Sequence, residues 1–227
     1  MIYFDKVSKI YSPTSIALED VSFTIKPSEF ISLVGPSGAG KSTLLKMLLA
    51  EERPTSGTVF FESHDVNKMT RIELPKIRRR MGVVFQDYRL LPHKTAYENI
   101  AFALEAGGAP EEDIERDVPQ VLDIVGLTDK AWHFPGQLSG GEKQRVAIAR
   151  AIVSKPDVVI ADEPTGNLDP ANTHDIIDLL QKINDMNNTI VILATHDKEV
   201  INSLRRRVVT LDKGKVVRDE EKGKYVL

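Results

Sequence analysis

The apolar residues in the N-terminal part of the chain follow the two-residue period of β-strands. Val21, Phe23 and Ile25 alternate with polar residues, so one face of this segment is expected to be buried. Residues 30–34 are apolar almost without interruption, which is typical of a strand buried on both faces. Residues 43–49 have helical character, and a glycine-rich loop lies between these two segments. This order predicts a strand, a loop and a helix in direct succession.

The middle of the chain, approximately residues 87–156, has the apolar spacing of helices. Residues 95–104 and 111–125 are rich in helix-forming residues, and a Gly-Gly-Ala-Pro loop separates them. Residues 158–161 and 189–193 are again apolar and are expected to be buried strands. Strands that alternate with helices predict an α/β fold with a parallel sheet, into which the helical middle is inserted as a subdomain.

The composition limits the class of protein. A chain of 227 residues is long enough for one α/β domain with a sizeable core, and residues 1–227 are expected to form that single domain. The apolar content of 41% is ordinary for a globular protein, and the net charge of −3 argues against a surface that binds nucleic acid. The absence of cysteine excludes disulfides and thiol catalysis, and it fits a reducing cytoplasm.

No segment of the chain has the pattern of a targeting or membrane-spanning sequence. Charge interrupts the first residues, so they are not expected to be a signal peptide. No apolar run approaches the roughly 20 residues that a membrane span requires. Contact with a membrane is therefore expected to come through a partner. Residues 219–224 are charged and expected at the surface, and Trp132 is expected to be a packing residue of the helical subdomain.

The glycine-rich loop after the strand at residues 30–34 fits the pattern G-x-x-x-x-G-K-[ST], from Gly35 to Ser42. Glycines allow successive backbone N–H groups to point at phosphate oxygens, and the following helix adds its positive N-terminal end. In this pattern Lys41 reaches the β- and γ-phosphates, and the Ser42 hydroxyl ligates Mg²⁺. An ordinary glycine turn is the alternative, but the strand and helix on either side favour a phosphate-binding loop.

Two carboxylates end the apolar strand at residues 158–161. Asp162 is placed to hold Mg²⁺, and Glu163 beside it is the candidate general base that activates water against the γ-phosphate. A solvated acidic turn is the alternative interpretation of these two residues alone. Because the phosphate-binding loop lies in the same chain, the catalytic interpretation is favoured.

A second glycine motif, Leu-Ser-Gly-Gly-Glu at residues 138–142, precedes the helical run of residues 143–154. Ser139 and the glycine N–H groups predict a second anion site at a helix N-terminus. The alternative is a purely structural cap, since Ser139 and Glu142 have the spacing of a capping box. A cap alone does not explain the two glycines.

These motifs, in this order, make nearly the whole chain resemble the ATP-binding cassette (ABC) ATPases. The resemblance implies a P-loop NTPase core with an N-terminal antiparallel β portion and an inserted helical subdomain. It implies ATP and Mg²⁺ as cofactors and the hydrolysis of ATP to ADP and phosphate. It also implies a head-to-tail homodimer, in which the loop at residues 35–43 of one chain and residues 139–142 of the other hold the same ATP.

The same resemblance assigns roles to individual residues. It makes Tyr11 the aromatic residue that stacks on adenine, and it gives the catalytic roles to Glu163, His196 and Gln86. Gly-Asn-Leu-Asp, which ends at Asp169, stands where the loop across the dimer interface is more often Ser-Ala-Leu-Asp. The implied Mg²⁺ ligands are Ser42, Gln86 and Asp162. The implied nucleotide-binding residues are Tyr11, Gly35, Pro36, Ser37, Gly38, Ala39, Gly40, Lys41, Ser42, Thr43, Ser139, Gly140, Gly141, Glu142 and Asp169.

Residues 164–169 resemble those of ABC ATPases that move a membrane protein in cell division, lipoprotein release or macrolide efflux. Residues 51–57, 82–92 and 218–223 favour the cell-division branch. That branch implies an FtsX-type integral membrane partner, which regulates cell-wall hydrolases, and a peripheral position on the inner face of the membrane at the division site. Contact with cytoplasmic division proteins is left open. The candidate contacts with the membrane partner are Asp87, Tyr88, Leu90 and Leu91.

Three other functions remain as alternatives at this point. An ATPase of a lipoprotein-release or macrolide-efflux transporter would have the same chemistry and a different membrane partner. A DNA-repair or chromosome-organising ATPase is disfavoured, because the chain has no sustained heptads and is acidic. A regulatory module without catalysis is disfavoured by the presence of Glu163 and His196.

Overall fold

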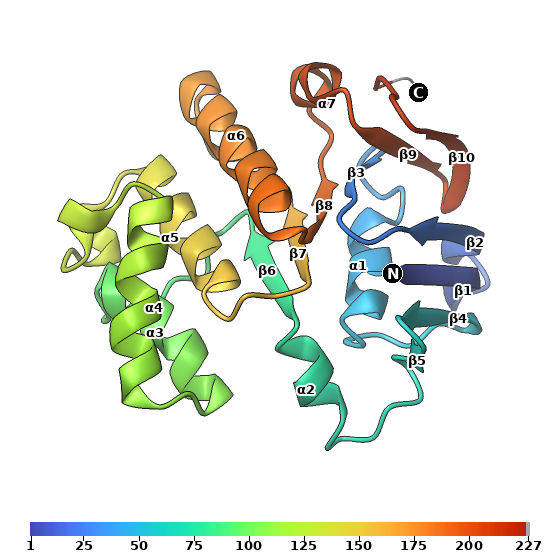
Figure 1. Ribbon diagram of the computed structural model, residues 1–227. Coiled ribbons are helices and arrows are strands. Elements are labelled where there is room, and N and C mark those ends of the chain that lie inside the picture. Colours follow the sequence, from blue (N-terminus) through green and yellow to red (C-terminus); the bar gives the residue numbers. More distant parts are fainter. Residues whose placement is uncertain (226–227) are drawn as a thin grey trace.

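The structure is a computed structural model that describes residues 1–225 (Figure 1). Its helices and strands, in chain order, are β1 (Ile2–Ser12), β2 (Ser15–Ile25), β3 (Phe30–Val34), α1 (Lys41–Leu48), β4 (Ser56–Phe61), β5 (His64–Asp65), α2 (Leu74–Arg78), β6 (Met81–Phe85), α3 (Ala96–Gly107), α4 (Glu111–Ile124), the 3₁₀ turns η1 (Thr128–Lys130) and η2 (Pro135–Gln137), α5 (Gly140–Ile152), β7 (Val158–Asp162), α6 (Pro170–Asn187), β8 (Ile190–Ala194), α7 (Lys198–Leu204), β9 (Arg207–Asp212) and β10 (Lys215–Glu220).

The strands form two sheets. One has four strands in the order β2-β1-β4-β5 and is antiparallel, and the other has six in the order β10-β9-β3-β8-β7-β6. In the larger sheet β9, β3, β8, β7 and β6 are parallel, and only the edge strand β10 runs the other way. The predicted α/β fold with a parallel sheet and an N-terminal antiparallel portion is therefore confirmed.

Both faces of the larger sheet are buried, as its apolar strands predicted. On β7, Val158 and Ile160 belong to a core shared with α1 and the antiparallel sheet. Val159 and Ala161, which alternate with them, belong to a second core shared with α3, α4, α5 and α6. Because successive residues of a strand point to opposite faces, an uninterrupted apolar run serves both cores at once.

The helices α3, α4 and α5 lie between β6 and β7 in the chain and to one side of the sheet, in green and yellow in Figure 1. Trp132, expected as a packing residue of this group, packs only at the outside of the group, because 68% of its surface is exposed. The carbonyl groups of its neighbours Ala131 and His133 accept hydrogen bonds from the first N–H groups of α3. The side chain between them therefore points outward, and its ring stacks on Tyr97 with centroids 4.9 Å apart.

The C-terminal strands were not predicted. Residues 219–224 were expected only as a charged surface segment, but Asp219 belongs to β10, which pairs with β9. Its carboxylate accepts from Nη2 of Arg207 at 2.7 Å, and the same guanidinium donates to Glu29 at 3.0 Å. Charged side chains thus hold the edge strand to the sheet, which hydrophobic periodicity cannot reveal.

The register of the parallel strands brings four loops to one edge of the sheet. Phe85 pairs with Asp162, Asp162 pairs with Ala194, and Ala194 pairs with Leu33. The loops after β6, β7, β8 and β3 consequently leave the sheet at the same level. In open α/β sheets this carboxyl edge is where ligands bind.

Gly82, in β6, provides a test of how closely the sheet approaches α5. A Cβ at this position would lie 2.2 Å from the backbone oxygen of Ala151. We expect Gly82→Ala to lower the free energy of unfolding by about 1–3 kcal/mol, because overpacking forces the backbone apart. Urea denaturation followed by circular dichroism measures this change.

Gly107→Ala is the matched control, since a Cβ added there meets nothing within 4 Å. It lies in α3, where alanine is favoured over glycine by about 0.5–1 kcal/mol, so its stability should be unchanged or slightly higher. Equal stability of both variants would contradict the close approach of β6 to α5.

Candidate functional site

The phosphate-binding loop connects β3 to α1 at the carboxyl edge of the sheet. Lys41 is the first residue of α1 and is only 7% exposed. Its Nζ donates to the backbone oxygens of Gly35 at 2.8 Å and Pro36 at 3.2 Å. The ammonium group and the positive N-terminal end of α1 therefore face the interior of the same loop.

A cavity of about 840 Å³ opens over this loop, within the range of small-molecule sites. It brings together residues that are far apart in the sequence and that come from four strand ends. Its lining is formed by Ala17, Pro36, Ser37, Gly38, Ala39, Gly40, Lys41, Ser42, Thr43, Gln86, Glu163, His196, Lys198 and Tyr225.

Glu163 follows the last residue of β7, and hydrogen bonds to residues at and after the end of β8 hold its backbone N–H and its carboxylate. Its backbone N–H donates to Ala194 O at 2.8 Å, and its Oε2 accepts from Oγ1 of Thr195 at 3.1 Å. Its Oε1 pairs with Nδ1 of His196 at 2.8 Å. Its φ of 50° is unusual for a residue with a side chain, and such strain is found where surrounding contacts impose it, often at active sites.

Within residues 1–225, Asp162 leaves one buried oxygen, Oδ1, without a hydrogen-bond partner. Burial raises the pKa of this carboxyl, and Ser42 and Lys41 oppose that increase while the charge of Glu163 adds to it. A buried carboxylate oxygen without a donor is costly, and a hard cation such as Mg²⁺ satisfies it.

The oxygen ligands around Asp162 fit an Mg²⁺ ion that is shared with a bound phosphate better than a metal ion whose ligands all come from the protein. The described part of the chain contains no group of three or more His, Cys, Asp or Glu residues that could hold a metal ion. Mg²⁺ typically takes one or two carboxylates together with substrate phosphates. Ser42, Gln86 and Asp162 all line a smaller hollow beside the cavity, so they are available as ligands or as hydrogen-bond partners of ligand water.

The loops after β6 and β7 are joined by a pair of amide side chains. Gln86 donates from Nε2 to Oδ1 of Asn167 at 3.3 Å, and Asn167 donates from Nδ2 to the backbone oxygen of Gln86 at 3.0 Å. The sequence placed Asn167 in the loop across the dimer interface but did not predict its contact with Gln86. The signal that could have found it was its departure from the commoner Ser-Ala-Leu-Asp form.

The second glycine motif caps α5, as its capping-box spacing predicted. Ser139 accepts from the N–H of Glu142 at 3.2 Å, and the Glu142 carboxylate accepts from the N–H of Ser139 at 2.8 Å. A Cβ on Gly141 would lie 2.2 Å from Oδ1 of Asn172, so this glycine also allows α5 to pack against α6. Ser139 is exposed, and residues 139–142 do not line the cavity over the phosphate-binding loop.

Asp169 and Tyr11 both lie outside the cavity lining. Asp169 caps α6 by accepting from the N–H and Nδ2 of Asn172 at 3.0 and 2.6 Å, and these bonds lower its pKa. Tyr11 lies near the C-terminal end of β1, and 54% of its surface is exposed. Its hydroxyl donates to the carboxylate of Glu52. The ring of Tyr11 also lies 5.0 Å from the ammonium of Lys9.

The family model for ABC transporters matches residues 18–166 of the chain. The cell division ATP-binding protein FtsE of Mycobacterium tuberculosis is 53% identical over 226 residues, which cover 99% of this chain and 98% of the relative. FtsE of Bacillus subtilis is 50% identical over 225 residues, with 99% and 98% covered. Among solved structures, the dimeric ATP-binding cassette MJ0796 in a post-hydrolysis state with ADP and phosphate is 37% identical with a TM-score of 0.87, covering 99% of this chain and 100% of that chain.

The pair of Gln86 and Asn167 generates a testable prediction. We expect Asn167→Ala to lower the rate of ATP turnover about tenfold. Without its two bonds to Asn167, Gln86 would be less well oriented toward the reacting groups, and orientation contributes to the rate. ATP affinity should change little, since Asn167 does not line the cavity over the phosphate-binding loop. Steady-state phosphate release and equilibrium nucleotide binding measure the two quantities separately.

Asn172→Ala is a useful comparison, because it removes an amide from the same region without touching Gln86. It should remove the bond from Nδ2 of Asn172 to Asp169 and lower stability by about 1 kcal/mol, while the backbone bond that caps α6 and the Gln86 loop stay in place. A similar loss of turnover in both variants would show that Asn167 has no specific role.

Proposed function

We propose that this chain, which belongs to the ABC transporter family, is the ATP-hydrolysing subunit of a bacterial cell-division complex. The observation that most supports this function is the position of Glu163. Its carboxylate is hydrogen-bonded to His196 and Thr195 and lies beside the phosphate-binding loop. Near-full-length FtsE relatives with half of their residues identical support the cell-division role over lipoprotein release or efflux.

In this proposal Glu163 is the general base. Its side chain is 18% exposed and aimed into the cavity, where it takes a proton from the water that attacks the γ-phosphate. His196 pairs through Nδ1 with Glu163, and its side chain is 67% exposed, so its other ring nitrogen is free to face a phosphate oxygen, to which it donates when the ring carries both protons. Lys41 and the loop N–H groups hold the phosphates.

Mg²⁺ would be held by Asp162 and Ser42, with Gln86 close to its water ligands. When bound, the ion neutralises charge on the β- and γ-phosphates. The unpaired Oδ1 of Asp162 supports this assignment.

We further propose that two chains close head to tail on two ATP molecules. Residues 139–142 lie outside the cavity of their own chain, and Ser139 is exposed, so a second chain can place them over the γ-phosphate. The related cassette MJ0796 is dimeric in two solved structures, one of them in a post-hydrolysis state. ATP then bridges the two chains, and hydrolysis removes the bridge.

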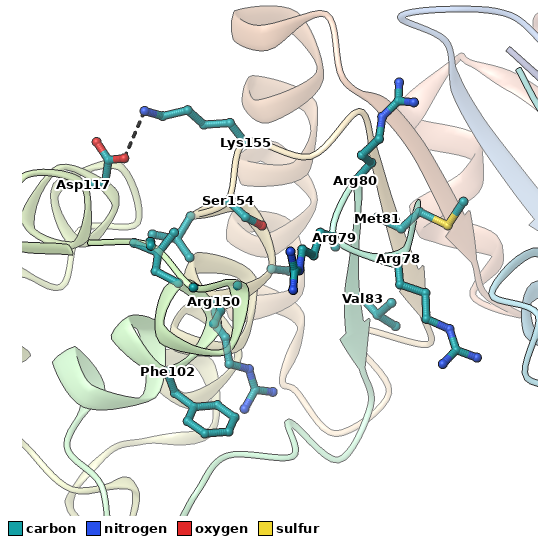
Figure 2. Close-up of a pocket in the computed structure, with 18 of the residues that line it drawn as sticks. Arg78, Arg79, Arg80, Met81, Val83, Phe102, Asp117, Arg150, Ser154 and Lys155 are labelled. Atoms are coloured by element: carbon teal, nitrogen blue, oxygen red, sulfur yellow. Dashed lines mark hydrogen bonds and ion pairs between the residues drawn. The ribbon is translucent and has the colours of Figure 1, made fainter. Parts of the chain in front are cut away.

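The FtsX-type membrane partner is proposed to dock in a second cavity, of about 690 Å³, between the sheet and the helical group (Figure 2). Figure 2 shows Arg78, Arg79 and Arg80 on the β6 side and Phe102 and Arg150 on the helical side. Phe102 is 43% exposed, so the cavity offers an apolar surface among basic groups. This would place the chain on the inner face of the membrane, where division occurs.

Arg150 connects this cavity to the nucleotide site. Its guanidinium donates to the backbone oxygens of Arg89 at 2.7 Å and Tyr88 at 2.9 Å, in the loop that follows Gln86. Partial burial lowers the pKa of this guanidinium. The residues expected from the sequence as the contact, Asp87, Tyr88, Leu90 and Leu91, lie in or next to this loop rather than in the cavity lining.

The hydrolytic role is tested by Glu163→Gln. We expect this variant to bind ATP, to turn it over at least about a hundredfold more slowly, and to accumulate as a dimer, because general-base catalysis contributes about 10²–10⁴-fold. Phosphate release and size-exclusion chromatography with light scattering measure both effects. Lys41→Ala should instead lose nucleotide binding, and near-normal turnover by Glu163→Gln would rule out Glu163 as the base.

The docking site is tested by a photo-crosslinking amino acid at Phe102 in the native cell. We expect a crosslink to a small membrane protein with few spans and a large extracellular loop. The control is the same probe at Val217, which is 59% exposed on β10. A crosslink from Phe102 to a transporter subunit with an efflux adaptor or lipoprotein carrier would overturn the cell-division assignment, and equal yields at the two positions would overturn the docking site.

A further inference from the structure

The C-terminal end of the described chain returns to the nucleotide cavity. After β10 the chain turns back, and Tyr225 joins Ser37 and Glu163 in the cavity lining. Figure 1 shows this end of the chain beside α7, which follows His196. Neither the motifs nor the proposed mechanism gives this segment a role.

Two kinds of contact hold Tyr225 at this position. Its backbone N–H donates to Oδ1 of Asn202, in α7, at 3.1 Å. Its ring packs against the buried side chains of Val34, Ile201 and Val208. Burial, and then the charge of Glu163, raises the pKa of the Tyr225 hydroxyl, which agrees with a ring enclosed near the catalytic carboxylate.

Tyr225 in turn holds the side chain of Lys198. The ammonium of Lys198 lies over the Tyr225 ring, 5.3 Å from its centroid, in the geometry of a cation–π contact. Lys198 lines the cavity and is the first residue of α7, two positions after His196. Lys198 is exposed at the cavity, where a ligand can reach its ammonium.

The position of Lys198 determines which part of a nucleotide it can meet. Lys41 lies inside the phosphate-binding loop, whereas His196 and Glu163 mark the side of the cavity where the reacting phosphate must lie. Lys198 comes from the same strand end as His196, which places it on that outer side. A cation there contacts the terminal phosphate of a triphosphate and has no matching group on a diphosphate.

We propose that Lys198, positioned by Tyr225, is a second cation for the terminal phosphate and makes the site prefer nucleoside triphosphate over diphosphate. This inference rests on the proposed function, in which the cavity binds ATP. Lys198 is the contact residue, and Tyr225 acts through it as a positioning residue.

The experiment compares equilibrium binding of a non-hydrolysable ATP analogue, AMP-PNP, and of ADP to the full chain. We expect Lys198→Met to weaken AMP-PNP binding about fivefold, as for one unit charge at contact distance in water, and to leave ADP binding unchanged. Lys198→Arg should restore the preference. The control Lys224→Met removes an exposed lysine outside the cavity lining and should change neither affinity.

The positioning role of Tyr225 has its own signature. Tyr225→Leu keeps an apolar side chain but removes the aromatic face, so AMP-PNP binding should weaken about twofold to fivefold, and Tyr225→Phe should behave as the wild type. In the Lys198→Met background, Tyr225→Leu should add no further loss. A merely structural role would instead lower the affinities for both nucleotides together.

Two outcomes overturn the inference. One is an unchanged ratio of AMP-PNP to ADP affinity in Lys198→Met, and the other is full additivity of the Lys198 and Tyr225 effects. Lys41→Ala separates this failure from failure of the proposed function. If Lys41→Ala abolishes binding while Lys198→Met leaves the ratio unchanged, only the role of Lys198 is wrong. If Lys41→Ala leaves binding unchanged, the nucleotide site itself is wrong.

Discussion

The structure depends on the register of its parallel strands. Because Phe85, Asp162, Ala194 and Leu33 lie opposite one another, the next residues of four strands emerge at one level of the sheet. A shift of one residue in any pair would exchange the side chains that the two cores receive, because successive residues of a strand such as β7 serve opposite cores, so the packing of both cores holds the register. The burial of apolar side chains that stabilises the fold therefore also brings the catalytic loops to the same level of the sheet.

At the carboxyl edge of the sheet the backbone hydrogen bonds between strands end, and hydrogen bonds made by side chains connect the loops instead. The carboxylate of Glu163 joins the loops after β7 and β8, and the side chain of Asn167 joins the loops after β7 and β6. Arg150 adds α5 to the same set through the carbonyl groups that follow Gln86. Because these bonds link consecutive loops, a displacement of one loop must break a bond or move the next loop as well.

Much of this site could be predicted from the sequence, because its parts are local motifs. The phosphate-binding loop needs one strand, one helix and glycines between them, and the cap of α5 needs only Ser139 and Glu142 at the right spacing. What could not be predicted depends on contacts between distant segments. Asn167 meets Gln86 across 81 positions, and Tyr225 reaches the cavity only because β10 and its turn bring it back. The outward side chain of Trp132 likewise follows from backbone bonds made by its neighbours.

The helix α5 is the element through which the two proposed partners can influence each other. Its N-terminus presents Ser139, which a second chain would bring to ATP, and its last turns carry Arg150, which lines the docking cavity and holds the loop after Gln86. The helix is closely packed against the sheet at Gly82 and against α6 at Gly141, so a displacement at one of its ends is passed along a densely packed element. Closure of the dimer at Ser139 would therefore shift Arg150 with it. The same displacement would reach both the proposed docking cavity and the loop after Gln86, so α5 would be the mechanical route between ATP and the proposed membrane partner.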